Sequence, residues 1–229
     1  MTRFLSKYLF FLLPFYLFAA SQDRDVSNFT SISVESNVVL WIEEASQESL
    51  KLEGTDNALA NIETTVDNKV LTIRPKSNTQ SAEKVQAYVT VKDLENLNIS
   101  GNVTTTTQNQ IKSSTFNFHA SGNSVTNLDL DVTTLNISLA GQSKLKLTGR
   151  AKTQTINAAG SSDIDAQTFQ TDNTTLNASG SAQIDVNATK TLDVTASGNA
   201  VIGYTGNPQV KKHLSGNAKV APLKTTGKS

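Results

Sequence analysis

The chain has 229 residues, among them 20 basic and 20 acidic side chains, two histidines and no cysteine. Because cysteine is absent, the chain can form no disulfide and no thiolate metal site, and it lacks the residue that carries the lipid anchor of bacterial lipoproteins. The balanced charge also excludes the basic excess that is typical of nucleic-acid-binding proteins.

Residues 1–21 are predicted to be an export signal. Arg3 and Lys7 supply positive charge, Tyr8 to Phe18 form an apolar core, and small residues suited to cleavage follow. This core is shorter than the ~20 residues of a membrane-spanning helix, so we expect no transmembrane segment after cleavage; an uncleaved anchor is the alternative. The mature chain has 18 basic and 20 acidic side chains, a net charge of −2. We expect it in the periplasm, at the cell surface or outside the cell.

The N-terminal third of the mature chain is predicted to be β structure of irregular spacing. After a polar lead-in over residues 22–27, alternation of apolar and polar residues begins at Phe29 and recurs in short runs up to Val91. Residues 28–94 therefore form either the first, irregular coils of the repeat that follows or a cap that covers its end. The sequence leaves both alternatives open.

From residue 95 onward, one short phrase recurs: alternating apolar residues, then a small residue, then glycine. The seven glycines are Gly101, Gly122, Gly141, Gly160, Gly180, Gly198 and Gly216. Their spacing of 18–21 residues suits one turn of a β-solenoid, in which each coil buries its apolar face against its neighbours. We predict an all-β chain, a single-stranded right-handed parallel β-helix over residues 28–222, regular over 95–222. A disordered tail is expected over residues 223–229.

Each phrase has an inward and an outward face. The residues two, four and six positions before the glycine are mostly apolar and are predicted to point inward. The glycine is expected at a bend with positive φ, and alternation resumes after it, giving two short strands per coil. In the last phrase Lys212 takes one of the apolar positions, as expected where a final coil faces solvent.

The chain resembles a known family at this point. An exported chain with Phe29, Ile32 and Val34 near its start, the alternating segment Ile62 to Ile73, and serial Ser-Gly phrases is similar to the putative auto-transporter adhesin head GIN domain family. The resemblance covers about residues 28–222. It implies a bacterial envelope or secreted β-helix among adhesin-like proteins. The family supplies no active-site motif, so no residue role is transferred, and likeness of fold alone does not establish function.

Three aspartates are the strongest candidates for chemistry. Asp163 and Asp165 follow one repeat glycine by three and five residues, and Asp185 follows the next by five, so all three are expected on one outward patch. Carboxylates ~5 Å apart act as acid and nucleophile in retaining glycosidases, and clustered oxygens suit calcium. The favoured alternative is a solvated charge ladder, in which Lys144 and Lys146 of the preceding coil pair with the aspartates.

A polar column one residue after the glycines is the candidate ligand-binding strip. Its amides are Asn102, Asn123, Gln142, Asn199 and Asn217, with Ser161 and Ser181 filling the gaps. These amides are predicted either to satisfy the bend or to bind sugar hydroxyls. Trp41 is the other candidate. If Leu40 and Ile42 point inward, Trp41 points outward as a sugar-stacking or protein-contact residue, but burial under the N-terminal cap is favoured.

These features predict a non-enzymatic, exported β-helix, without a cofactor or a metal site, that presents a rigid polar surface for adhesion or for binding glycan or envelope components. Many weak contacts along one face would add up. The expected partner is a polysaccharide or a cell-envelope protein. One alternative is a polysaccharide hydrolase or lyase that uses the three aspartates. A second alternative is a structural component of an envelope assembly.

Overall fold

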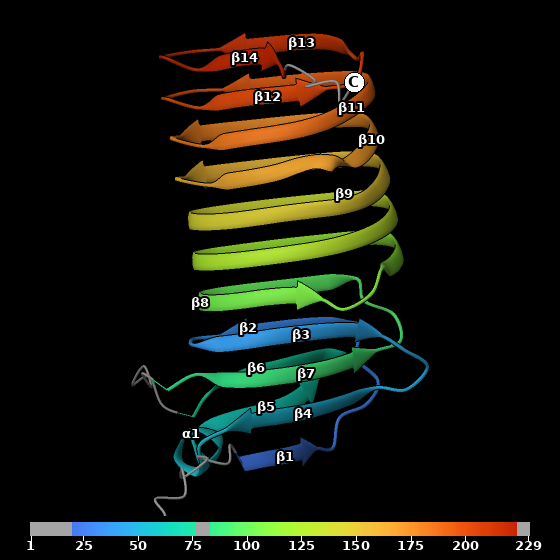
Figure 1. The fold of residues 1–229 in the computed structure, drawn as a ribbon, viewed down its shortest axis with the longest axis vertical. Helices are drawn as coiled ribbons and strands as arrows, with labels where there is room; N and C mark the ends of the chain where they lie inside the picture. Colours follow the sequence, from blue (N-terminus) through green and yellow to red (C-terminus); the bar gives the residue numbers. More distant parts are fainter. Residues whose placement is uncertain (1–19, 77–82, 224–229) are drawn as a thin grey trace, which may run out of the picture.

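The computed structural model describes residues 20–76 and 83–223, which form a tall stack of β coils (Figure 1). Residues 1–19 of the predicted export signal, and all of the predicted tail except Leu223, lie outside these residues. The strands in chain order are β1 (Ala20–Arg24), β2 (Ser31–Glu35), β3 (Val38–Glu44), β4 (Ser49–Gly54), β5 (Ile62–Asp67), β6 (Val70–Pro75), β7 (Val85–Val91), β8 (Asn96–Thr107), β9 (Ile111–Gly160), β10 (Asp163–Gly180), β11 (Gln183–Ala196), β12 (Val201–Thr205), β13 (Gln209–Leu214) and β14 (Lys219–Pro222). One short helix, α1 (Asp56–Ala60), interrupts them.

The predicted β-solenoid fold is confirmed. From β8 to β14 every pairing is parallel, and residues one repeat apart lie side by side, as in Asn96 beside Asn117 and Gly160 beside Gly180. The coils differ from the prediction in one respect. The backbone stays extended through the glycine bends in the middle of the stack, so β9 alone runs for 50 residues rather than as separate short strands.

The N-terminal coils do not stack in chain order. β2 and β3 lie parallel to β8 on one side and parallel to β6 and β7 on the other. The coil made of β2 and β3 is therefore sandwiched between the later coil of β6 and β7 and the regular repeat. The chain passes beyond this first coil, builds the end of the molecule, and then returns across it to start β8 at Asn96.

An antiparallel layer closes the N-terminal end. β4 pairs with β1 and β7, and β5 pairs with β6, all antiparallel. Helix α1 lies beside them, and the hydroxyl of Thr55 caps it by accepting from the N–H of Ala58. Residues 28–94 thus contain both stacked coils and capping strands. The predicted lead-in over residues 22–27 is corrected in part, because Ala20–Arg24 form strand β1.

The core follows the predicted alternation along nearly every coil. Its largest fully buried side chains include four phenylalanines, Phe29, Phe116, Phe118 and Phe169. Polar side chains are buried as well, and several have polar atoms without a hydrogen-bond partner: Thr105, Ser124, Thr126, Ser143, Gln154 and Ser162. An unsatisfied buried polar group costs about 1–3 kcal/mol, so these coils depend on the surrounding apolar contacts and strand pairing for their stability.

The C-terminal end carries an open coil. β13 pairs with β11 and β14 with β12, and neither has a further strand neighbour among the described residues. Lys212 is exposed at its apolar position, as expected. Leu223, expected in the disordered tail, is instead half-buried, and its N–H donates to the carbonyl of Tyr204 at 2.8 Å.

All seven repeat glycines have positive φ, from 69° to 93°. Gly180 illustrates why no other residue fits: a Cβ there would lie 2.6 Å from the carbonyl oxygen of Gly160 in the preceding coil. Both the backbone conformation and the close stacking of coils therefore exclude a side chain.

Substitution at these glycines is expected to destabilise the fold. Gly180→Ala should lower the free energy of unfolding by about 3 kcal/mol, because it combines left-handed backbone strain with a backbone clash. Gly54→Ala is the matched control, since a Cβ there would make only ordinary contacts, the nearest at 3.5 Å to Leu59. Urea unfolding followed by circular dichroism measures both variants. Equal stability of the two would contradict the stacking argument.

Candidate functional site

A shallow groove follows the solenoid axis along the segment that precedes each glycine. It consists of two depressions of about 290 and 430 Å³ that share Ser138 and Ala140 and are therefore continuous. We call it the axial groove. Its lining residues come from seven coils: Ser33–Glu35, Asn98–Ser100, His119–Ser121, Ser138–Ala140, Asn157–Ala159, Asn177–Ser179, and the pair Thr195 and Ser197. Six rung spacings give it a length of about 29 Å.

The groove is hollow because small residues precede the glycines. In the regular repeat, the column next to the bend holds only serine and alanine, as in Ser121, Ala140 and Ala159, and Glu35 takes this position in the first coil. The column two residues earlier carries longer polar side chains such as Asn157 and Asn177. Among the lining residues only Glu35 and His119 are ionisable. The groove is therefore nearly uncharged, with amide and hydroxyl groups along it.

Two ladders of asparagine brace this side of the solenoid. Asn136 donates to Asn117, Asn117 donates to Asn96 and Asn96 donates to Ser31, each at 2.9–3.0 Å, and these side chains are partly buried. Within the groove, Asn177 donates to Asn157 at 2.9 Å. Each amide that bonds along the axis still has a second N–H and an oxygen lone pair that can face outward.

The predicted amide strip lies on the far side of the glycines. Asn102, Asn123, Gln142, Asn199 and Asn217 are all exposed, together with Ser161 and Ser181, and none of them lines either depression. In this column Asn217 donates to Asn199 at 3.0 Å. The predicted strip is thus a row of exposed side chains beside the bend, and the axial groove lies next to it.

The three aspartates come together as the repeat predicted. Asp165 lies beside Asp185 on the next coil and beside Lys146 on the preceding one, and Asp163 lies beside Lys144. The predicted ion pairs do not form, because neither lysine is within 4 Å of an aspartate in the described coils. The charge ladder is therefore a set of neighbouring charges without direct bridges.

Asp185 is the one perturbed member of this patch. Burial raises the pKa of its carboxyl above the usual value, and a hydrogen bond from Gln167 at 3.0 Å opposes the shift. The negative charges of Asp165 and Asp163 raise the pKa further, and the N–H of Gly203 lowers it. A half-buried carboxyl beside a second carboxylate favours its protonated form more than an exposed, isolated carboxyl does.

Trp41 lies on the outer surface of the capping region. Leu40 and Ile42 are buried, so the indole points away from the core. It is nevertheless half-buried, and its Nε1 is buried without a hydrogen-bond partner, so the side chain is neither fully covered nor freely exposed. Its ring stacks on Tyr88, with centroids 6.5 Å apart and planes 12° apart, and the Lys51 ammonium lies 4.7 Å from the centre of the Tyr88 ring. The two rings and the Lys51 ammonium thus contact one another, and the half-buried indole offers only part of its surface to a sugar.

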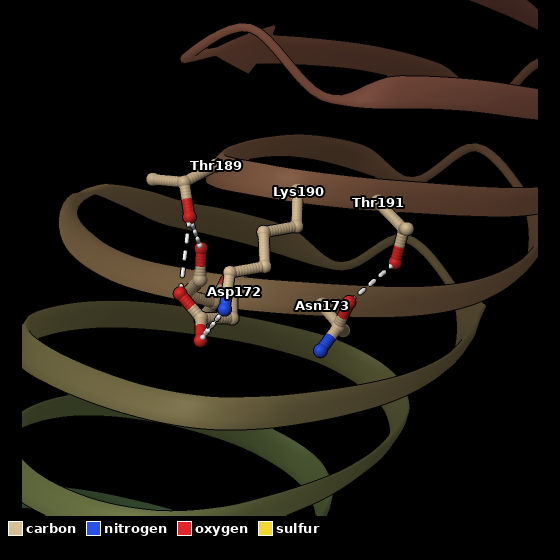
Figure 2. Close-up of polar contacts among 6 residues, drawn as sticks. Asp172, Asn173, Thr189, Lys190 and Thr191 are labelled. Carbon is tan, nitrogen blue, oxygen red and sulfur yellow. Dashed lines mark hydrogen bonds and ion pairs between the residues drawn. The ribbon is translucent and has the colours of Figure 1, made fainter.

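The opposite edge of the coils carries polar links between neighbours (Figure 2). Lys190 binds Asp172 at 2.8 Å, and the Thr189 hydroxyl donates to the same carboxylate at 3.2 Å. Thr191 donates to Asn173 at 2.8 Å. Lys190 lowers the pKa of Asp172 by hydrogen bonding and by its charge. Because these side chains bind one another across neighbouring coils, we assign this edge a structural role.

The described residues show no metal-binding chemistry and no membrane span. Within 20–76 and 83–223, no group of three or more histidine, aspartate or glutamate side chains could hold a metal ion. The calcium alternative for the aspartates therefore has no ligand cluster to support it. Over the same residues, no helix is long and apolar enough to cross a membrane.

A family model and two solved structures that resemble this chain are described as putative adhesins. Residues 28–208 match the model of the family described as putative auto-transporter adhesin, head GIN domain. A putative adhesin from Bacteroides fragilis is 21% identical with a TM-score of 0.76, covering 89% of this chain and 94% of its own. One from Parabacteroides merdae is 16% identical, with a TM-score of 0.73 and coverages of 91% and 98%.

A third structure carries a different description. It is a putative lipid binding protein from Parabacteroides distasonis, 20% identical with a TM-score of 0.71, covering 91% of this chain and 98% of its own. No curated protein sequence matches this chain. At these identities the structural likeness establishes the fold alone.

The raised pKa of Asp185 predicts a pH-dependent stability. The folded state binds the proton more tightly than the unfolded state, so stability contributed by this group falls as pH rises above the usual carboxyl value of 3.8. Asp185→Asn should therefore unfold at a higher urea concentration than the unmodified chain at pH 7, with the difference vanishing below about pH 3. Asp193→Asn, at an exposed position of the same solenoid, is the control. A destabilised Asp185→Asn protein at pH 7 would contradict the assignment.

Proposed function

This chain belongs to the putative auto-transporter adhesin head GIN domain family, and from this premise we propose that it is an exported, non-enzymatic binding protein. We propose further that it holds an extended neutral polymer in the axial groove. Family membership confirms the resemblance predicted from the sequence. The adhesin-like family supports a position outside the cytoplasm, which agrees with the predicted export signal.

The continuity of the axial groove is the observation that carries the proposal. Two depressions joined at Ser138 and Ala140 make one surface across seven coils, whereas a small-molecule site would be closed at both ends. A linear ligand can repeat the same weak contact at each rung. Such contacts add because the coils hold their spacing, so no single residue has to supply most of the affinity.

The chemistry of the groove favours a neutral glycan. Its lining offers amides and hydroxyls from Asn98, Asn157, Asn177 and Thr195, which bind sugar hydroxyls as donors and acceptors. With only two ionisable lining residues, the groove has no charge with which to select an anionic polymer. Exposed Cβ atoms of alanine and serine along the floor give an apolar strip for the flat face of a sugar ring.

A second candidate function rests on the aspartates. Asp185 has a raised pKa and lies directly beside Asp165 on adjacent strands, about 5 Å apart by the rung spacing. Carboxyl groups about 5 Å apart act as acid and nucleophile on a glycosidic bond, and side chains that project in parallel from adjacent strands keep roughly the strand spacing. This acidic patch lies outside the axial groove, so polymer binding and polymer cleavage can be tested separately.

Filling the axial groove is expected to abolish binding. Ala140→Trp places a large side chain where the two depressions meet, and we expect binding to immobilised neutral polysaccharides to weaken about tenfold or more, because the groove is cut in two. Ser181→Trp is the matched control, since Ser181 is exposed in the column beyond the glycines and does not line the groove. Equal binding by both variants would contradict the proposal.

The same samples test the enzymatic alternative. Release of new reducing ends from the bound polysaccharides, lost in Asp185→Asn and retained in Ala140→Trp, would make the acidic patch a hydrolytic site. The proposed function predicts no release from any polymer.

A further inference from the structure

Charge is distributed unevenly between the two ends of the solenoid. Residues 22–95, which build the capped end, contain thirteen acidic and seven basic side chains, a net charge of −6. Residues 194–223, which build the last described coils, contain three lysines and no acidic residue, a net charge of +3. The intervening coils are nearly neutral, with seven acidic and six basic residues. The mature chain is therefore an electric dipole along its long axis, although its net charge is close to zero.

The basic end is also the open end. β13 and β14 form the last layer of the stack in Figure 1, and among the described residues no strand covers them. Lys211, Lys212 and Lys219 are exposed there. Leu214 stands at an inward position of this coil but is 39% exposed, because the next layer that would bury it is missing.

Protection against aggregation accounts for part of this pattern. Lysine on an edge strand, and Lys212 pointing over the end of the core, discourage pairing with a second copy. That role does not require one sign of charge throughout, because acidic side chains also protect an edge strand. It explains neither the absence of any acidic residue after Asp193 nor the opposite charge of the capped end.

We propose that the C-terminal end of the solenoid docks on the surface of an anionic lipid bilayer. Exposed lysines at this end lie close to headgroup phosphates, and Leu214 adds an apolar contact at the headgroup level. The acidic capped end is repelled by the same surface. Attraction at one end and repulsion at the other orient the solenoid upright, a result that scattered lysines would not give.

Vesicle co-sedimentation tests this docking. The chain from Ala20 onward contains every described strand pairing and is the sample. It is expected to bind vesicles of phosphatidylcholine with 30% phosphatidylglycerol at about 50 mM salt, to remain free with phosphatidylcholine alone, and to dissociate near 1 M salt. Lys211→Gln with Lys219→Gln should weaken binding about 25-fold, about fivefold for each lysine.

The control removes the same charge elsewhere. Lys84→Gln with Lys92→Gln changes two exposed lysines near the acidic end and should leave vesicle binding unchanged. Failure to bind anionic vesicles, or equal weakening in both double variants, would overturn the proposal. Complete displacement from vesicles by soluble polyphosphate at equal phosphate concentration would assign the surface to phosphate polymers instead of a bilayer. Ala140→Trp changes the axial groove and leaves the basic end intact, so vesicle docking is tested independently of the proposed function.

Discussion

The backbone of each bend glycine lies against the backbone of the bend glycine in the preceding coil, and the rest of the repeat depends on this contact. From Gly122 to Gly216, a Cβ would lie 2.6–3.0 Å from the carbonyl oxygen of the previous glycine. Side chains are thus excluded from this line throughout the regular repeat, whereas Ser36 takes the equivalent position in the first coil with φ of 79°. The residues just before that line are small as well, and their column is the floor of the axial groove. The groove is a consequence of how the coils stack.

The opposite edge of the coils has more freedom, and the chain uses it for polar links. Loop lengths vary there, which is why the repeat length varies between 18 and 21 residues. Contacts such as Arg150 to Asp131, a two-pronged ion pair at 2.8 and 2.9 Å, connect successive coils across these variable stretches. Exposed ion pairs of this kind contribute little stability each. They fix register where the glycine column is far away, while hydrophobic burial supplies most of the favourable free energy.

The features that follow from the repeat could be predicted from the sequence, whereas those that depend on departures from the repeat could not. Periodicity placed the seven glycines, the inward columns and the stacking of Asp185 on Asp165, because residues one period apart must be neighbours in a solenoid. It could not show that the coil of β2 and β3 is inserted between later segments, since no local pattern records stacking order. Trp41 was assigned to the interior because its strand lies in the irregular part, where the inward frame is ambiguous. The groove was missed because concavity depends on side-chain size on both flanks, not on polarity alone.

The axial groove and the basic end are perpendicular surfaces of the same rigid body. The groove extends as far as Thr195 and Ser197, and the next coil along the axis is the one that carries Lys211 and Lys212. In the proposed upright orientation, a polymer in the groove runs away from the bilayer, and its near end lies about one rung spacing from the basic coil. A neutral ligand in the nearly uncharged groove would then be neither attracted nor repelled by the bilayer charge that orients the protein. The membrane-docking end and the neutral groove can act separately only if the stack between them stays straight. The glycine column supports this by fixing the spacing of the coils.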